Sequence, residues 1–466
     1  MSGRRIAILF FLILLVVAAV VAVPLALRAV PSRYIAYAAD RLPAPLKEPF
    51  NRVALPQQES PILPTAVALA DTSVLLGRPG ALEPASVIIQ VATSLPPTFT
   101  PPPHTDVPQP PTETPTPLPP TEPPLSIVTA VPPTPTLPPI PDAIRLVGFR
   151  HQFQEWNNCG PATLAMALSF FGMNLNQAQI ANATKPNPED RNVSPAEMAA
   201  YVNESTPYRA LFRVNGRVEI VKQLLANGIP VILELGLNPP GDLSWMGWYG
   251  HYMLAVAYDD ALQQFWVYDS WLGTGRETLS NTDPNGRVLT YADLARDWPH
   301  FNRNYIALYR PEQAQVVAGI MGAEMDDATM WQNALRQAQQ DAHSDPQNAF
   351  YWFNLGTSLN QAGNYEGAAQ AFDQARAIGL PWRMLWYQFG PYEAYYQVGR
   401  YDDVILLADI TLKDRPYFEE SFYYKALAQA ALAKVADART NLQRAIAFNP
   451  NFSPAAEALS QLESGG

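Results

Sequence analysis

One stretch of this chain cannot contribute to a packed core, and it divides the rest of the sequence. Between Pro96 and Asp142 lie 20 of the 47 prolines, many of them beside threonine. Such a sequence favours an extended polyproline II chain that rises about 3 Å per residue. It therefore predicts a semi-rigid linker at 96–142 with a reach on the order of 100 Å. Whatever folds into a core must lie before or after it.

The segment before the linker begins with a long uncharged run. Residues 1–5 carry two arginines, and no charged residue follows from Ile6 to Leu27, a length that crosses a bilayer as a helix. The run is longer than the apolar part of a secretory signal peptide. It predicts an uncleaved transmembrane signal-anchor at 6–28, with 1–5 cytoplasmic and the rest extracytoplasmic. Residues 29–95 are either a stalk or a small module.

Charge and composition exclude several classes of protein. The formal net charge of -11, without a basic stripe, argues against binding of nucleic acid. A single cysteine allows neither an internal disulfide nor a cysteine cluster for metal, and the five histidines show no i, i+4 spacing. We therefore expect no metal and no cofactor. The hydrophobic content of 48% predicts well-formed cores.

After the linker, residues 143–312 have the composition of a globular domain. Ser194 and Glu197 have the spacing of a capping box with Pro195 between them, which predicts the start of a helix. A second helix is expected at 218–226. Runs rich in Val, Tyr, Phe and Ile predict later strands at 231–235, 252–258, 264–269 and 304–309. Helices followed by an antiparallel sheet indicate an α+β fold.

The only cysteine, Cys159, stands at the start of a helical pattern within Q-E-W-N-N-C-G-P-A-T-L-A-M-A-L. Pro161 favours the beginning of a helix and Gly172 its end. Free N–H groups and the macrodipole at such a terminus favour a thiolate. A buried structural cysteine is the competing interpretation, because free cysteine packs as a small hydrophobe. A base placed elsewhere in the domain has to decide between them.

Two expected strands supply a base and a carboxylate. His251 lies near the start of one strand, in G-H-Y-M-L-A-V-A-Y-D, and Asp269 ends the next, in V-Y-D-S-W. A hairpin between these strands would bring the two side chains within hydrogen-bonding reach. Asp269 has an alternative role as a turn-forming residue before Ser270. His151 is expected to be a loop residue rather than the base.

Further side chains are candidates for the same site. Gln154 lies five residues before Cys159, where its amide could donate to an oxyanion together with the Cys159 N–H. Gln152 competes for that role, and either can be a solvent-facing loop residue. Four aromatic residues near His251 either line a substrate cleft or belong to the core: Trp245, Trp248, Tyr249 and Tyr252.

These motifs, over residues 145–310, resemble the papain-like cysteine peptidases of the bacteriocin-processing type (double-glycine leader peptidases, family thirty-nine). The resemblance implies Cys159 as nucleophile, His251 as general acid/base, Asp269 as the residue that orients the imidazole and Gln154 as oxyanion donor. Transporter-linked members of that family also carry membrane helices and an ATPase. This sequence has no G-x-x-x-x-G-K-[ST] motif, so export-coupled cleavage of leader peptides is not expected.

The last part of the chain, 325–464, is helical and periodic. Prolines at 346, 381, 416 and 450 recur at a spacing that indicates a helical solenoid. The unit containing Trp352, Leu355, Gly356 and Phe372 resembles the tetratricopeptide repeat. Pro391 breaks the first helix of the middle unit, and 452–464 is expected to be a capping helix.

The sequence therefore predicts a membrane-anchored cysteine peptidase that hydrolyses peptide bonds through a Cys-His-Asp triad. The repeats would bind a protein partner or present a peptide or protein substrate, since concave solenoids commonly bind extended peptides. Two alternatives stay open. The same triad serves an acyltransferase or transpeptidase, in which an amine replaces water. Alternatively, the chain is a non-catalytic peptide-binding surface scaffold.

Overall fold

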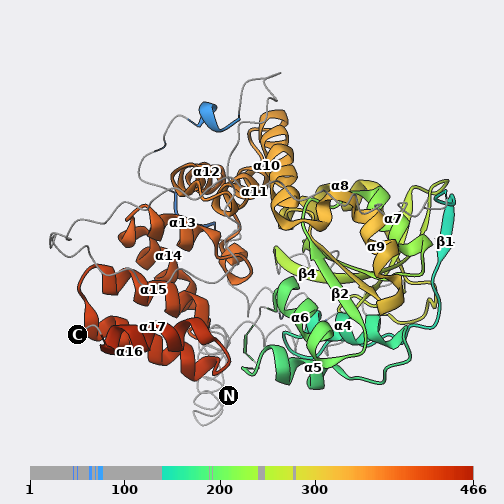
Figure 1. The fold of residues 1–466 in the computed structure, drawn as a ribbon, viewed down its shortest axis with the longest axis horizontal. Coiled ribbons are helices and arrows are strands. Elements are labelled where there is room, and N and C mark those ends of the chain that lie inside the picture. The colour runs from blue at the N-terminus through green and yellow to red at the C-terminus, as the bar shows by residue number, and fades with distance from the viewer. Residues whose placement is uncertain are drawn as a thin grey trace, which may run out of the picture. The chain divides into compact units, whose positions relative to one another are not determined.

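The computed structural model (Figure 1) describes residues 46, 50, 62–65, 69, 72–76, 139–187, 189, 190, 193–239, 247–275 and 280–464. The expected signal-anchor at 6–28 and most of the linker lie outside these residues. None of the helices in the described part is long and apolar enough to cross a membrane. The described residues of 139–237 and 249–464 belong to one compact unit.

A seven-stranded antiparallel sheet is the centre of the first folded region. The order across it is β2-β7-β3-β4-β5-β6, and β1 pairs with β4 outside that path. Its strands are β1 (Ala143–Arg145), β2 (Arg209–Arg213), β3 (Val231–Leu237), β4 (Tyr249–Asp259), β5 (Gln264–Asp269), β6 (Arg287–Thr290) and β7 (Tyr305–Tyr309). The four strands expected from the sequence are present, and the short strands β1, β2 and β6 are additional.

Helices cover both faces of this sheet (Figure 1). One layer consists of α4 (Cys159–Ser169), α5 (Gln177–Thr184) and α6 (Pro195–Ser205), and the other includes α7 (Val218–Ala226), α8 (Tyr291–Asp297) and α9 (Ala314–Met321). Successive residues of β3 alternate between the layers: Val231 and Leu233 pack toward α7, and Ile232 packs toward α4. A strand buried on both faces has to be apolar at nearly every position.

Two helices form where the sequence predicts them, and the core of the domain extends further along the chain than expected. Ser194 and Glu197 form the expected capping box at the start of α6, and α7 occupies the expected 218–226. The expected end of the domain at residue 312 is too early. Val317, Ile320 and Met321 of α9 are buried in the core beside α7, because the apolar side of this helix needs a partner. We call residues 143–321 the α+β region.

The rest of the described chain, 327–464, is the helical region. Its helices are α10 (Asp327–Ser344), α11 (Ala349–Gln361), α12 (Tyr365–Ile378), the 3-10 helix η6 (Trp382–Trp386), α13 (Gly390–Gln397), α14 (Tyr401–Asp414), α15 (Glu419–Ala431), α16 (Val435–Phe448) and α17 (Ser453–Ser464). Gly356 lets α11 and α12 approach, since an added Cβ would lie 2.7 Å from Cδ1 of Phe372. Six of these helices form three successive pairs: α11 with α12, α13 with α14, and α15 with α16. The turn inside each pair contains a residue with positive φ: 73° at Gly363, 75° at Gly399 and 57° at Ala433.

The middle helix pair departs from its neighbours where the sequence did. Pro391 lies in the first turn of α13, where its missing N–H costs nothing, but it prevents a helix from continuing through that position. The first helix of this pair, α13, therefore has only 8 residues, and the chain before it forms the short 3-10 helix η6. The break separates η6 from α13.

The α+β region and the helical region share buried contacts. Val214 forms a small apolar cluster with Met330 and Ala334 of α10. The Nδ2 of Asn354 in α11, whose side chain is buried, donates to the carbonyl of Pro299 at 2.7 Å. The helical region is therefore packed against the α+β region instead of being joined to it by chain connection alone.

Candidate active site

Cys159 is the first residue of α4, and the composition of that helix explains its position. Every residue from Gly160 to Ser169 is buried, because the helix is apolar on all sides and packs into the core beside β4. Because α4 begins at Cys159, Pro161 is the third helical residue. A proline is tolerated there because N–H groups in the first turn lack helical partners. Cys159 itself stays partly exposed as a free thiol. A rigid helix thus holds an accessible sulfur at its N-terminus.

The pairing of β4 with β5 brings His251 and Asp269 together. Met253 is directly opposite Asp269, and His251 lies two residues before Met253 on the same face of β4. Diagonal neighbours across an antiparallel pair are within reach of long side chains. His251 Nε2 and Asp269 Oδ1 are 2.8 Å apart, and both side chains are buried. The expected hairpin geometry is realised.

His251 also contacts Cys159, so its imidazole lies between the thiol and the carboxylate. Cys159 contributes to the raised pKa of His251 through hydrogen bonding and charge, and His251 Nε2 faces Asp269. Burial alone would lower the pKa of His251, but the charge of Asp269 and the hydrogen bonds from Asp269 and Cys159 raise it to about 10. The imidazole is therefore protonated near neutral pH.

Asp269 fulfils both roles that the sequence left open. Its Oδ1 accepts from His251 and also from the backbone N–H groups of Trp271 and Leu272, at 2.7 and 2.9 Å, which is a turn-forming arrangement. Burial raises the pKa of Asp269, but the charge of His251 and these hydrogen bonds hold it below its usual value. The turn fixes the carboxylate that faces the imidazole.

The loop that carries Gln154 is tied to the same turn. The Gln154 N–H donates to the carbonyl of Ser270 at 2.7 Å, and Ser270 Oγ donates to Gln154 Oε1 at 3.0 Å. His151 Nε2 lies 2.7 Å from the carbonyl oxygen of Asp269, so His151 is a loop residue that reinforces this connection. With its Oε1 engaged, Gln154 presents its Nε2 as a donor. Gln152 Nε2 instead donates to the carbonyl of Leu175.

Two of these supporting residues were not anticipated from the sequence. Ser270 is fully buried and orients the Gln154 amide. Gln177, buried at the start of α5, accepts from the Glu155 N–H at 2.6 Å and donates to the Phe153 carbonyl at 2.8 Å. In the sequence, Gln177 is a polar residue in the segment after the expected nucleophile helix. Its partners Glu155 and Phe153 could not be identified from the sequence, because they lie more than 20 residues away.

The four aromatic residues expected near His251 have different environments. Trp245 lies outside the described residues. Trp248 and Tyr252 are buried, and the Tyr252 hydroxyl donates to the Val193 carbonyl at 2.8 Å, so Tyr252 belongs to the core and not to an open cleft. Tyr249 is half-buried, and Trp271 lies between it and His251, with ring centroids 6.0 Å from each. The unanticipated Trp271 is therefore a ring beside the imidazole, and Tyr249 packs against Trp271.

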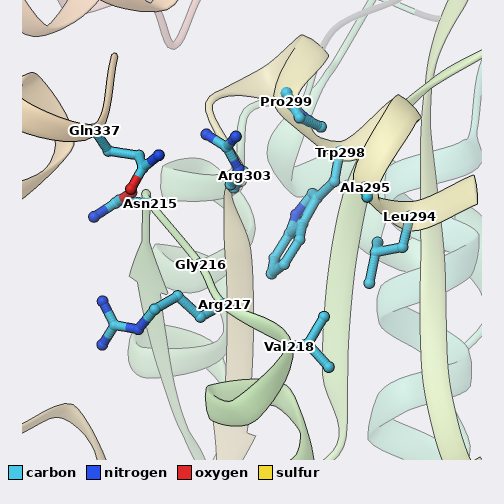
Figure 2. A pocket seen from close by; sticks show the side chains of 10 residues that line it. All are labelled: Asn215, Gly216, Arg217, Val218, Leu294, Ala295, Trp298, Pro299, Arg303 and Gln337. Atoms are coloured by element: carbon cyan, nitrogen blue, oxygen red, sulfur yellow. The ribbon is translucent and has the colours of Figure 1, made fainter. Parts of the chain in front are cut away.

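A separate cavity of about 220 Å³ lies away from these residues. Figure 2 shows the Trp298 ring between Arg303 on one side and Leu294 on the other. Arg303 is paired with Asp341, and Arg217 with Glu324. Cys159, His251 and Asp269 do not line this cavity, and its two arginines are paired with carboxylates.

Comparison with known proteins finds one family model that matches most of the α+β region. Residues 146–304 match the Peptidase_C39 like family. This part of the chain is a C39-like α+β domain, and a helical region follows it. No curated protein matches the chain.

Three similar solved structures each match about a third of the chain. One, from Bacillus anthracis, is described as a C39-like peptidase; it is 13% identical with a TM-score of 0.29, and the match covers 36% of this chain and 98% of that chain. Another is MamA from Desulfovibrio magneticus RS-1, residues 41 to the end, 15% identical with a TM-score of 0.25, covering 30% and 86%. An ArsTM double mutant of MamA RS-1 is 16% identical with a TM-score of 0.24, covering 30% and 88%.

We predict that the His251–Asp269 pair makes stability depend on pH. The pKa of His251 rises from 6.5 to about 10, so its contribution is complete below 6.5 and is lost as the pH rises to about 10. The pKa of Asp269 falls below 3.8, so its contribution is complete above that pH and is lost in acid. In denaturant titrations, wild type should exceed Asp269→Asn in free energy of unfolding most at about pH 5–6, and the difference should shrink toward pH 10.

Asp293→Asn is a matched control, since Asp293 is paired with Arg296 at 2.8 Å and arginine keeps its charge throughout this range. Its effect on stability should stay constant between about pH 6 and 10. A difference between wild type and Asp269→Asn that is equally constant would show that His251 does not carry the charge assigned to it.

Proposed function

We propose that the C39-like domain is a cysteine peptidase that hydrolyses peptide bonds. The observation that carries this proposal is the position of the His251 imidazole, which lies 2.8 Å from Asp269 Oδ1 and interacts with Cys159. A nucleophile, a base within reach of it and a third group that orients the base are the parts that nucleophilic catalysis requires. The chemistry assigned to each residue follows from these contacts.

In the first half-reaction, the Cys159 thiolate attacks the carbonyl carbon of the peptide bond. The oxyanion that forms accepts hydrogen bonds from Gln154 Nε2 and from the Cys159 N–H, which has no intrahelical partner because it lies in the first turn of α4. His251 then donates its proton to the leaving amine, which departs and leaves a thioester on Cys159. Asp269 keeps the imidazole oriented and stabilises its positive charge.

In the second half-reaction, water attacks the thioester. His251, now neutral, accepts a proton from that water, and the second tetrahedral intermediate collapses to release the carboxylic acid and the thiolate. An amine that replaces water at this step would give a new amide instead. The triad is compatible with both outcomes, and the contacts within it favour neither, so hydrolysis is tested directly against transfer.

Cleavage is tested with a pool of peptides incubated with the protein in water enriched in ¹⁸O and analysed by mass spectrometry. Hydrolysis predicts new C-termini that carry ¹⁸O; transfer predicts new amide bonds without the label. Cys159→Ser should abolish cleavage, and Asp269→Asn should lower it by about 10⁴-fold with the fold retained, because the imidazole loses its orientation. Cleavage that persists in Cys159→Ser would rule out the proposed mechanism.

The assignment of the oxyanion donor has its own matched pair. Gln154→Ala should lower the cleavage rate by about 10²- to 10³-fold, as the loss of one oxyanion donor does. Gln152→Ala, in the same loop but bonded to the carbonyl of Leu175, should leave the rate within a factor of about two. Circular dichroism checks that both variants fold. Equal rates for the two variants would exclude Gln154 from the site.

We further propose that the helical region consists of tetratricopeptide repeats that present the substrate or bind a protein partner. The three helix pairs with equivalent turns at Gly363, Gly399 and Ala433 support this identity. Peptides cleaved in the ¹⁸O experiment, carrying a photo-crosslinker and bound to the Cys159→Ser protein, should then crosslink to α11–α16 as well as to the C39-like domain. Crosslinks confined to the C39-like domain would contradict a presenting role.

We also propose that residues 6–28 anchor the protein in a membrane, with both folded regions extracytoplasmic. The uncharged run from Ile6 to Leu27 supports the anchor, and the arginines before it support the orientation. The full-length chain should stay in the membrane fraction after alkaline extraction, and protease added outside intact cells should digest the folded regions. Release by alkali, or protection from external protease, would refute the anchor or the orientation respectively.

A further inference from the structure

We propose that η6 and the residue after it, Tyr387, form a positioning element for His251. This element acts through Arg383 and Tyr387 and thereby supports the chemistry of the C39-like domain. This inference rests on the proposed function. It assigns the helical region a part in building the active site, beyond binding a partner or a substrate.

The N-terminal end of β4, which carries His251, needs support from outside the hairpin with β5. The pairing between β4 and β5 ends at Met253 and Asp269. The residues before Met253 are paired with β3, where Tyr249 is opposite Leu237 and His251 is opposite Leu235. On the β5 side, therefore, no strand pairing among the described residues fixes the backbone of His251.

The helical region contacts Tyr249, which lies on the same face of β4 as His251. The Arg383 guanidinium lies 4.0 Å from the centroid of the Tyr249 ring, a close cation–π contact. Trp386 packs against the same ring at 6.3 Å. Trp271 then joins Tyr249 to His251, with ring centroids 6.0 Å from both. A continuous row of rings leads from η6 to the imidazole.

The other face of the strand end is covered too. A Cβ added to Gly250 would come within 2.6 Å of Phe301 Cζ and 3.2 Å of Tyr387 Cδ1, so the backbone between Tyr249 and His251 lies directly against both rings. The Phe301 and Tyr387 rings are in contact with each other, with centroids 5.8 Å apart. The strand end is thus held on both faces, and η6 and the residue after it contribute to each side.

The contacts of η6 inside the helical region make it a firm support. Met384, Leu385 and Trp386 are fully buried. Trp386 packs against Phe418 with ring centroids 5.8 Å apart. The Arg415 guanidinium lies over the Trp386 ring, 5.3 Å from its centroid. Any movement of η6 would therefore disturb the packing of the last helix pairs. Catalytic groups need this stability, because a displacement of about 1 Å can cost on the order of a hundredfold in rate.

The experiment uses the full-length chain and its only thiol. Rates of alkylation of Cys159 by iodoacetate and by iodoacetamide are measured by intact mass across the pH range. A protonated His251 next to the thiolate attracts the carboxylate of iodoacetate, so the ratio of the two rates reports on the position and charge of the imidazole. Wild type should favour iodoacetate near neutral pH and lose that preference as the pH approaches about 10.

Tyr387→Leu should lower this ratio about tenfold and move its alkaline loss to lower pH, because the strand end loses the ring against Gly250. Tyr387→Phe keeps the ring and should restore the wild-type ratio. Phe448→Leu is the matched control: it removes a half-buried ring that stacks on Phe422 at 5.7 Å, in the last helix pair. It should leave ratio and pH profile unchanged. Thermal unfolding checks that each variant is folded.

Arg383→Lys is a second, milder variant in case Tyr387→Leu does not fold. It keeps the positive charge, so the attraction of iodoacetate by residue 383 itself is unchanged, but it replaces the planar group over Tyr249. It should lower the ratio about two- to threefold. A wild-type ratio and pH profile in whichever variant folds would overturn the inference. A wild-type Cys159 no more reactive than free cysteine would instead overturn the proposed function.

Discussion

The buried contact between His251 and Asp269 is the interaction on which the site depends. A carboxylate and an imidazole removed from water are costly unless each satisfies the other, and the turn after β5 adds two backbone hydrogen bonds to the carboxylate. Their pairing requires the register of β4 and β5, since a slip by one residue would send one side chain to the opposite face of the sheet. The hydrophobic pattern that buries both faces of β4 therefore also sets the geometry of the His251–Asp269 pair.

A second constraint links the nucleophile loop to this pair. Residues 151–154 are joined to Asp269 and Ser270 by His151, by the Gln154 backbone and by the Gln154 side chain. Gln177 holds the same loop from α5. The group proposed to bind the oxyanion and the group that orients the imidazole are thus parts of one hydrogen-bonded unit. Precise placement of this kind is what electrostatic stabilisation of a transition state needs.

The helical region enters the same structure through its one irregular helix pair. Pro391 shortens α13, and the chain before it forms η6, which packs on Tyr249 and thereby on the end of β4. The first core extends past the expected end of the domain at residue 312, because α9 completes it, and α10 shares an apolar cluster with Val214. Contacts between the two regions depend on side chains far apart in the sequence, and local sequence patterns do not predict them.

Local patterns were sufficient for several of the elements and for the contact between His251 and Asp269. Apolar periodicity and capping residues located α4, α6, α7 and the strands β3, β4, β5 and β7, and the chain's single cysteine left Cys159 as the one candidate for a thiol nucleophile. Hairpin logic then paired His251 with Asp269, because adjacent strands with a short turn have few possible registers. Tertiary structure alone decided the rest. It placed Tyr252 in the core, bound Gln154 to Ser270 and brought η6 to Tyr249, since each of these contacts joins residues whose proximity arises only when separate elements pack.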